Sequence, residues 1–513
     1  MSDWNSGYVS EIDYTHGYYP ELSPLRLQLS MLSQQQAHRV GRPLRYLELG
    51  YGQGLTLNIH AAAVGGEFWG TDFNPTHASN ARELADASGA NLRLLDDSFE
   101  ELGRRTDLPE FDIIALHGIW SWISDENRAV VVDLMRRKLA VGGFVYLSYN
   151  CTPGWSAAMP LRHLLVLHSE LTSGDSQGLV NKMEAALGFA QRMVEAGAQY
   201  FAVNPHVSER LKRLTGQNRH YLVHEYFNGH WLPQPFAEVA RDLDEAKLSF
   251  AASSNLLDHI DAINLSPAQQ ALLGESKNPV LNQSLRDYMV NQQFRRDLWV
   301  KGPRQLGPRQ QMDAMAAKRF VLLVPSADVV LKVSGALGEA ELQPDVYVPV
   351  LEQLSSAGGL PKTALSIGQA LPALNMAQVM QALLVLTAAS YVSPAQDEAE
   401  IAAARPRTDA LNRYLITRAI HSGEIGWLAS PVIGGGVPVG RFQQLFIGAI
   451  EAGQTSPQEW AATVWGKLST QGEYIVKEGV ALTTATENLA ELETQAKHFA
   501  EHRQAMLKVL GIG

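Results

Sequence analysis

A short acidic and glycine-rich stretch is the part of this 513-residue chain whose residue types and spacing could most directly serve chemistry. Glu48 lies near the end of an apolar run, residues 44–49, which predicts a buried strand, and residues 55–64 predict a helix. The glycines of the turn between them alternate with other residues: Gly50, Gly52 and Gly54. Glycine accepts a positive φ and lets the backbone approach a ligand closely. A carboxylate at this entrance would repel a diphosphate, but it would suit a ligand that carries an amine and a sulfonium.

Two further apolar runs end in acids that could hold a nucleoside. Residues 67–72 end at Asp72, about 20 residues beyond the turn, where a ribose-binding carboxylate is expected. Residues 91–99 predict a third strand followed by acids, a serine and a phenylalanine, which could bind an adenine amino group and pack against its ring. Asp97 is the expected adenine contact. The alternative for each acid alone is an ordinary polar loop residue.

Later segments predict how the sheet continues. Residues 111–116 predict a fourth strand and residues 144–148 a fifth, which follows a glycine turn. Residues 235–251 predict a helix and a strand, and residues 294–301 predict a closing strand. The chain is therefore expected to form an α/β fold with an open, mostly parallel sheet of seven strands, whose ligands lie at the carboxyl ends of the strands.

This order resembles the class I S-adenosylmethionine-dependent methyltransferases, which share the acidic glycine loop, the ribose acid, the adenine acid and the glycine-preceded fifth strand. The resemblance implies a Rossmann-like sheet, adenosylmethionine as the methyl donor, S-adenosylhomocysteine as the product, and no metal. It also implies cofactor contacts from the glycine loop and from the loops after the second, third and fourth strands. These are Glu48, Gly50, Tyr51, Gly52, Gly54, Asp72, Phe73, Asn74, Asp97, Ser98, Phe99, His117 and Gly118.

Three segments narrow the resemblance: residues 14–24, residues 221–228, and residues 286–288 with 294–296. They are similar to bacterial methyltransferases with a methyltransferase regulatory domain, a group that includes lysine methyltransferases of surface and outer-membrane proteins. The resemblance implies N-methylation of lysines in a protein substrate, and a homodimer is one expected state. Two alternatives remain open: a methyltransferase for a small metabolite or surface precursor, and a non-catalytic module that binds adenosylmethionine.

Methyl transfer is an in-line displacement, so catalysis depends on positioning and on an unprotonated nucleophile. His117, at the end of the fourth strand, is the candidate general base, and the alternative is that it lines the cofactor pocket. Asn/Asp-Pro-Pro-Tyr/Phe, a motif of many nucleobase methyltransferases, does not follow this strand. The residues expected to orient the acceptor are Tyr149, Asn150 and Trp120. Those expected to wall its pocket are Tyr18, Tyr19, Trp122 and Trp155, with packing or plain surface as the alternative.

Composition limits the partners. A net charge of −11 without a Lys/Arg stripe argues against nucleic acid. Cys151 is the single cysteine, so no intrachain disulfide forms, and His16, His224 and Glu225 lack metal-ligand spacing. No signal peptide or apolar run of about 18 residues occurs, which predicts a cytoplasmic protein without membrane insertion.

The predicted domains follow from these signals. The N-terminal part is expected to be a lid or substrate segment, followed by the methyltransferase domain with a helical insertion and a regulatory, completing segment. Three short helices and a strand then resemble a winged helix, whose third helix lacks Lys and Arg and so favours protein contact over DNA. A linker over residues 395–407 and a helical C-terminal domain with a glycine-rich loop, residues 430–438, are expected last. The N-terminal segment is expected over residues 1–40 and the methyltransferase domain over residues 41–305, with the insertion at about 156–230 and the completing segment at about 221–305. The winged-helix-like domain is expected over residues 306–395 and the helical C-terminal domain over residues 396–513.

Overall fold

The computed structural model describes residues 15–39, 43–172, 174 and 177–513. Of the predicted N-terminal segment 1–40, residues 1–14 and residue 40 therefore lie outside the described residues, and with them Tyr14, the first residue of the segment 14–24.

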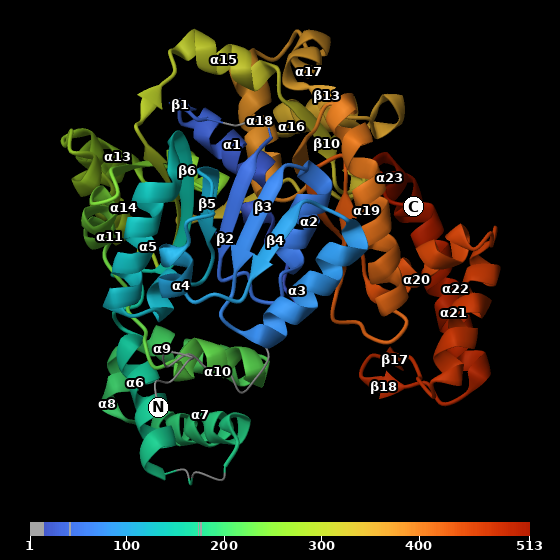
Figure 1. The fold of residues 1–513 in the computed structure, drawn as a ribbon, viewed down its shortest axis with the longest axis horizontal. Coiled ribbons are helices and arrows are strands. Elements are labelled where there is room, and N and C mark those ends of the chain that lie inside the picture. Colours follow the sequence, from blue (N-terminus) through green and yellow to red (C-terminus); the bar gives the residue numbers. More distant parts are fainter. Residues whose placement is uncertain (1–14, 40–42, 173, 175–176) are drawn as a thin grey trace.

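A seven-stranded sheet with the strand order β4-β3-β2-β5-β6-β8-β7 forms the centre of the molecule (Figure 1). Strands β2 to β6 are parallel, and β8 runs antiparallel between β6 and β7. The predicted fold class is confirmed, although the fifth strand is longer than expected. The strands are β2 (Arg45–Leu49), β3 (Glu67–Thr71), β4 (Leu92–Leu95), β5 (Phe111–Leu116), β6 (Leu139–Asn150), β7 (Leu248–Ser253) and β8 (Phe294–Lys301).

Helices cover both faces of this sheet, which explains why its strands are apolar on both sides. Alternate residues of β2 point to opposite faces of the sheet. Tyr46 packs in the apolar core under α1, α2 and α3, and Leu47 packs in the core under α4, α5 and α11. One layer contains α1 (Pro24–Ser33), α2 (Leu55–Val64) and α3 (Pro75–Ser88). The opposite layer contains α4 (Phe99–Arg104), α5 (Asp125–Lys138) and α11 (Phe236–Asp244).

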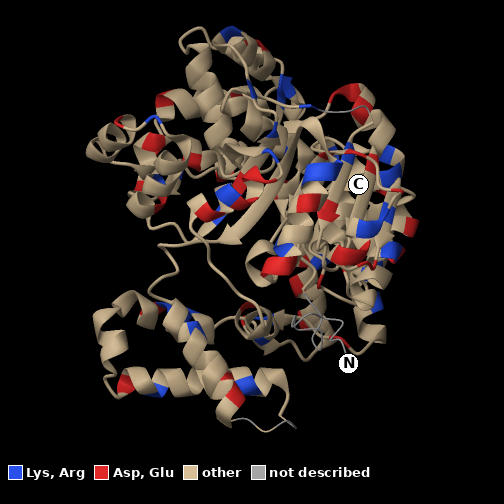
Figure 2. Ribbon diagram, turned by 60° about the vertical axis from the view of Figure 1, so that its left-hand side comes forward, with Lys and Arg blue, Asp and Glu red and all other residues tan. Residues whose placement is uncertain are grey.

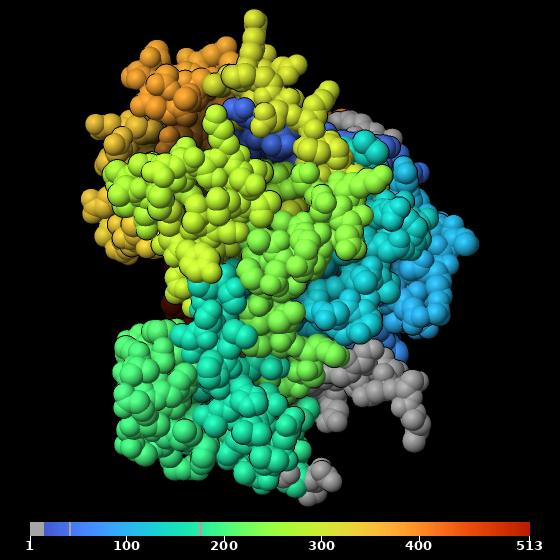
Figure 3. Space-filling view, turned by 90° about the vertical axis from the view of Figure 1, so that its left-hand side faces the viewer, coloured from blue at the N-terminus to red at the C-terminus, as the bar shows by residue number. Residues whose placement is uncertain are grey.

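Five helices between β6 and α11 form a separate lobe with its own apolar core (Figure 3). Helices α9 and α10 lie beyond the C-terminal ends of the parallel strands (Figure 1). The Gly154 amide donates to the Gln292 carbonyl at 3.0 Å, which joins the start of the lobe to the sheet beside β8. The helices are α6 (Met159–Thr172), α7 (Leu179–Glu195), α8 (Gln199–Val203), α9 (Pro205–Thr215) and α10 (Arg219–Phe227).

The region after β8 contains the three predicted short helices, which lie around a small antiparallel sheet. Its helices are α16 (Pro344–Ser355), α17 (Ala364–Ala370) and α18 (Met376–Ala388), and its sheet joins β13 (Lys362–Thr363), β10 (Arg319–Leu322) and β14 (Val392–Ala395). The likeness of this arrangement to a winged helix remains a prediction.

The predicted linker is wrong, because most of it forms helix α19 (Glu398–Arg418). Asp397 and Glu400 form a capping box at its start, and the alanines that suggested a linker favour a helix here. The helix packs on α2 and α3, which cover one face of the seven-stranded sheet (Figure 1). The predicted glycine-rich loop instead lies within a hairpin of β15 (Trp427–Ser430) and β16 (Gly435–Pro438). The helices that follow are α20 (Arg441–Glu451), α21 (Pro457–Thr470), α22 (Ala485–His502) and α23 (Gln504–Val509).

Candidate active site

The glycine turn between β2 and α2 has the backbone that its sequence predicts. Gly50, Gly52 and Gly54 have φ values of 73°, 57° and 75°, in the left-handed region that favours glycine. A Cβ at Gly54 would lie 2.4 Å from the Ala81 Cβ of α3, so this glycine also permits close helix packing. The Tyr51 hydroxyl donates to the Leu95 carbonyl at 2.8 Å, which ties the turn to the end of β4.

Glu48 is a buried carboxyl beneath this turn. It is 3% exposed, and its Oε2 has no hydrogen-bond partner among the described residues. Burial, and secondly the Asp72 carboxylate, raise its pKa to about 8. The group is therefore mostly neutral at pH 7, and a bound cation would favour its ionised form. This chemistry fits the ammonium and sulfonium groups of adenosylmethionine.

Asp72 follows β3 directly and organises the turn. Its Oδ2 accepts from the Gly52 amide at 2.8 Å, and its Oδ1 accepts from the Asn74 amide at 3.0 Å and lies 3.1 Å from His77 Nδ1. A carboxylate has about four acceptor positions, so about one remains for a ribose hydroxyl. Asn74 also caps α3 by accepting from the Thr76 amide at 3.0 Å, and Phe73 is half-buried beside it.

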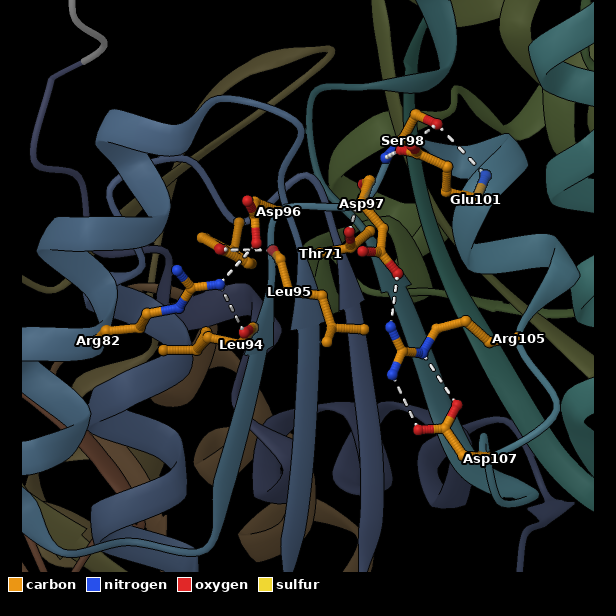
Figure 4. Close-up of polar contacts among 11 residues, drawn as sticks. Thr71, Arg82, Leu94, Leu95, Asp96, Asp97, Ser98, Glu101, Arg105 and Asp107 are labelled. Carbon is orange, nitrogen blue, oxygen red and sulfur yellow. Dashed lines mark hydrogen bonds and ion pairs between the residues drawn. The ribbon is translucent and has the colours of Figure 1, made fainter.

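The end of β4 carries the predicted adenine contacts (Figure 4). Asp97 Oδ2 accepts from Arg105 Nη1 at 3.0 Å, and Arg105 also holds Asp107 with two hydrogen bonds of 2.9 Å. Ser98 caps α4 through a capping box with Glu101, so its polar groups already have partners. Phe99 packs against the sheet core. Asp97 is thus oriented by Arg105 and keeps acceptor capacity for an exocyclic amine.

His117 and Gly118 follow β5. The Gly118 amide donates to Ser148 Oγ at 2.8 Å, and His117 Nδ1 lies 2.9 Å from the Tyr146 hydroxyl. The His117 ring is also 4.1 Å, centroid to centroid, from the ring of Tyr19. Burial lowers the pKa of His117 to about 4, which makes it a poor acceptor for an ammonium proton. Of the two predicted roles, this geometry favours lining the pocket.

The residues predicted to orient the acceptor divide into two groups. Tyr149 and Trp120 lie in the core, where the Tyr149 hydroxyl donates to Asp297 Oδ2 at 2.9 Å and Trp120 Nε1 donates to Gln234 Oε1 at 2.8 Å. Their positions do not support contact with an acceptor, because these polar groups already serve the core. Asn150, at the end of β6, is also buried, but its Nδ2 has no hydrogen-bond partner among the described residues.

The four residues predicted to wall the acceptor pocket lie in different places in the fold. Tyr18 points away from the sheet edge: its hydroxyl accepts from the Gly436 amide at 2.7 Å and lies 3.0 Å from His60 Nε2. Trp122 is buried and 8% exposed, in agreement with the packing alternative. Trp155 is 6% exposed and lies where the helical lobe joins the sheet, with the Arg210 guanidinium carbon 3.8 Å from its ring centroid. Tyr19, which is half-buried, therefore remains a candidate for the pocket wall near the strand ends, and Trp155 remains one only through the arginine that is stacked on its ring.

A chain of hydrogen bonds that the sequence did not reveal joins the C-terminal region to the glycine turn. Arg418 Nη1 of α19 donates to Asn80 Oδ1 at 2.7 Å, and Asn80 Nδ2 donates to the Gln53 carbonyl at 2.9 Å. The sequence predicts a linker over residues 395–407, so it gives no signal for this contact.

Comparisons with known proteins agree with the architecture. Residues 47–143 match the model of a methyltransferase domain, and residues 218–301 match that of a predicted methyltransferase regulatory domain. A protein of Synechocystis sp. is 41% identical over 512 residues, which cover 99% of each chain. A protein of Rickettsia prowazekii is 25% identical over 267 residues, 50% of this chain and 45% of its own.

Solved structures share the whole fold. PKMT2 from Rickettsia typhi has a TM-score of 0.68 at 14% identity, covering 96% of this chain and 99% of its own. The same protein in complex with AdoHcy has a TM-score of 0.68 at 15% identity, covering 95% and 98%. At this identity the likeness concerns the fold.

The strand order and the glycine turn, with acids at the ends of β3 and β4, define a class I adenosylmethionine-dependent methyltransferase. Adenosylmethionine is its methyl donor, and no group of three or more metal-ligating side chains occurs in the described part of the chain. More particularly, the chain belongs to the methyltransferases that carry a methyltransferase regulatory domain, in one family with the Synechocystis protein. None of the helices that the structure describes is long and apolar enough to cross a membrane.

Proposed function

We propose that this methyltransferase N-methylates lysine side chains of a protein substrate. The observation that carries the proposal is the likeness to PKMT2 along nearly the whole chain, including the helical lobe and the C-terminal region. The abbreviation PKMT denotes protein lysine methyltransferase. A lobe of five helices beside the strand ends would be superfluous for a small acceptor, whereas it could bind a polypeptide.

The residues at the strand ends have distinct roles in this proposal. The glycine turn and Glu48 hold the methionine part of the donor, Asp72 holds the ribose and Asp97 the adenine. Bound adenosylmethionine supplies the methyl group as an electrophilic carbon on sulfur. Asn150 orients the acceptor amine by accepting one of its N–H protons with the side-chain oxygen, which leaves the lone pair of the amine free to attack. Tyr19 and Trp155 exclude water from the acceptor.

The charge distribution supports a protein rather than a nucleic acid as the partner. Lys and Arg positions are interspersed with Asp and Glu positions over the elements in Figure 2. A nucleic-acid substrate would call for a dense cationic face. A cytoplasmic location and a homodimer are further parts of the proposal that depend on the family resemblance.

Transfer of tritium-labelled methyl groups into a lysate of the source cells tests this function. The wild-type protein is compared with Asp72→Ala, and protein and small-molecule fractions are separated. Label on lysine, located by mass spectrometry and absent with Asp72→Ala, is the expected result. Label confined to small molecules would instead identify a metabolite enzyme, and binding of donor without any transfer would identify a non-catalytic module.

A further inference from the structure

Helix α10 carries a carboxyl group that faces a pocket rather than open solvent. Glu225 and Tyr221 line this pocket of about 170 Å³ together with residues of α9, the preceding helix. The Tyr221 hydroxyl forms a hydrogen bond with the Glu225 carboxyl. No role for Glu225 emerged from its spacing in the sequence.

This pocket lies on the same side of the sheet as the strand ends that form the cofactor site. Arg210, which also lines the pocket, donates from Nη1 to Gln293 Oε1 at 3.4 Å, and the Gln293 carbonyl accepts from the Cys151 amide at 2.9 Å, directly after the end of β6. The segment after α10 returns along the same edge, where the Gln234 amide donates to the Asn150 carbonyl at 3.1 Å. Arg210 thus ties the wall of the pocket to the C-terminal end of β6, where Asn150 lies.

Two arginines lie within electrostatic reach of Glu225. Arg210 is stacked on Trp155 with 3.8 Å between the guanidinium carbon and the ring centroid, and Arg162 is stacked on Trp231 at 4.8 Å. Arg162 Nη2 also donates to the Asn228 carbonyl at 2.7 Å. Cations fixed beside a binding site disfavour a further positive charge there, so an amine that enters is more easily held in its neutral form.

We propose that the junction of α10 with the strand ends is the acceptor site for a primary amine, and that Glu225 removes the proton from the lysine ammonium group. The inference rests on the proposed function. The carboxylate takes one proton and becomes a neutral acid, and the amine keeps its lone pair. That lone pair forms the new nitrogen–carbon bond while the carbon–sulfur bond breaks. The electrons of the broken bond stay on sulfur, which becomes a neutral thioether. The methylated product is again an ammonium ion, and Glu225 returns its proton to water.

The protonation properties of the pocket agree with this role. Burial raises the pKa of Glu225 to about 7, against the opposing effects of Tyr221, Arg210 and Arg162. A base whose pKa is near the working pH combines a useful ionised fraction with proton affinity. Burial is also the largest cause that raises the pKa of Tyr221, so the Tyr221 hydroxyl remains protonated. Arg213 of α9 is the further charged group that lines the pocket.

Glu225→Gln tests the inference because it keeps the shape and removes the basic oxygen. Initial rates of tritium-labelled methyl transfer to the protein fraction of the source lysate are measured from pH 6 to pH 9.5. Glu184→Gln is the matched control, since Glu184 is an exposed carboxylate of the same lobe that pairs with Arg219. Calorimetric affinity for S-adenosylhomocysteine and the midpoint of thermal unfolding are measured in parallel for all three proteins.

The wild-type rate is expected to rise with pH up to about pH 7 and then to level off. Glu225→Gln should be slower by about 100-fold to 10,000-fold at pH 7 and should recover as the pH approaches the lysine pKa of about 10.4. Its product affinity and thermal midpoint should equal those of Glu184→Gln. A loss that is the same at every pH, or no loss, would overturn the role of Glu225. A wild-type protein that labels no lysine would refute the proposed function, and this inference with it.

Discussion

Neutralising Glu48 should change how the affinity for adenosylmethionine depends on pH. The carboxyl has a pKa of about 8 in the ligand-free protein, so about one molecule in eleven is ionised at pH 7. If the cationic ligand requires the ionised form, the dissociation constant at pH 7 is raised about elevenfold, which corresponds to about 1.4 kcal/mol. Between pH 6 and pH 7 the affinity should therefore rise nearly tenfold. A Glu48→Gln variant should bind more weakly, with a much flatter pH dependence.

The sign of this effect follows from the raised pKa. The folded, ligand-free protein prefers the neutral carboxyl, so this group's contribution to stability is fully present below its ordinary pKa of 4.5 and is lost progressively as the pH rises to about 8. Ligand binding reverses the preference and releases a proton. At pH 7 about 0.9 proton should be released per ligand bound, because about ten of eleven carboxyls start protonated.

Isothermal titration calorimetry in two buffers with different ionisation enthalpies measures this release directly. Glu100→Gln is the matched control, because Glu100 is an exposed carboxylate near the same edge of the sheet. The ratio of wild-type to variant affinities cancels any titration of the ligand itself. Equal pH dependence in wild type and Glu48→Gln, or no proton release at pH 7, would refute the assignment of Glu48 to the cationic part of the ligand.

Three other substitutions probe the site and its support. Arg418→Ala should weaken adenosylmethionine binding about fivefold by calorimetry, since a hydrogen bond contributes about 1 kcal/mol, whereas the exposed Arg413→Ala should not. Arg295→Met leaves two buried carboxylates without their cation and should lower the free energy of unfolding by about 3–5 kcal/mol in urea titrations; an equal loss with the exposed Arg241→Ala would contradict this. His117→Asn should lower the transfer rate without moving the midpoint of its pH profile, because this histidine is already neutral above about pH 4, and a shifted midpoint would restore its role as the base.

The cofactor half of the site was predictable because its residues are close in sequence to the strands that position them. Each acid follows an apolar run directly, and parallel strands bring such ends to one edge of the sheet. Asp72 lies one residue beyond β3, and Asp97 two residues beyond β4. The buried partners of these acids could not be read in the same way. His77 reaches Asp72 only because α3 begins with a particular turn, and Arg105 reaches Asp97 from the far end of α4.

The aromatic candidates show where sequence reasoning stops. Tyr18 and Tyr19 are adjacent, yet Tyr18 contacts the C-terminal hairpin and Tyr19 contacts His117. Successive side chains of an extended segment point in opposite directions, and only the fold determines which of them faces the ligand. Likewise Trp120 and Trp155 are both buried, but Trp120 packs in the core of the sheet, whereas Trp155 supports an arginine at the lobe.

The acceptor half of the site has no local signal because elements far apart in the chain build it. Asn150 ends a strand, Tyr19 precedes the first helix, and Glu225 lies in the last helix of the lobe. No spacing rule connects three such positions, whereas burial of the carboxyl and its contact with Tyr221 distinguish Glu225 at once in the folded protein. The division has a physical consequence. Donor binding depends on the glycine turn after β2 and on the loops after β3, β4 and β5, whereas acceptor binding depends on how the lobe is seated on the sheet. Substitutions at that joint should therefore alter acceptor use and leave donor affinity intact.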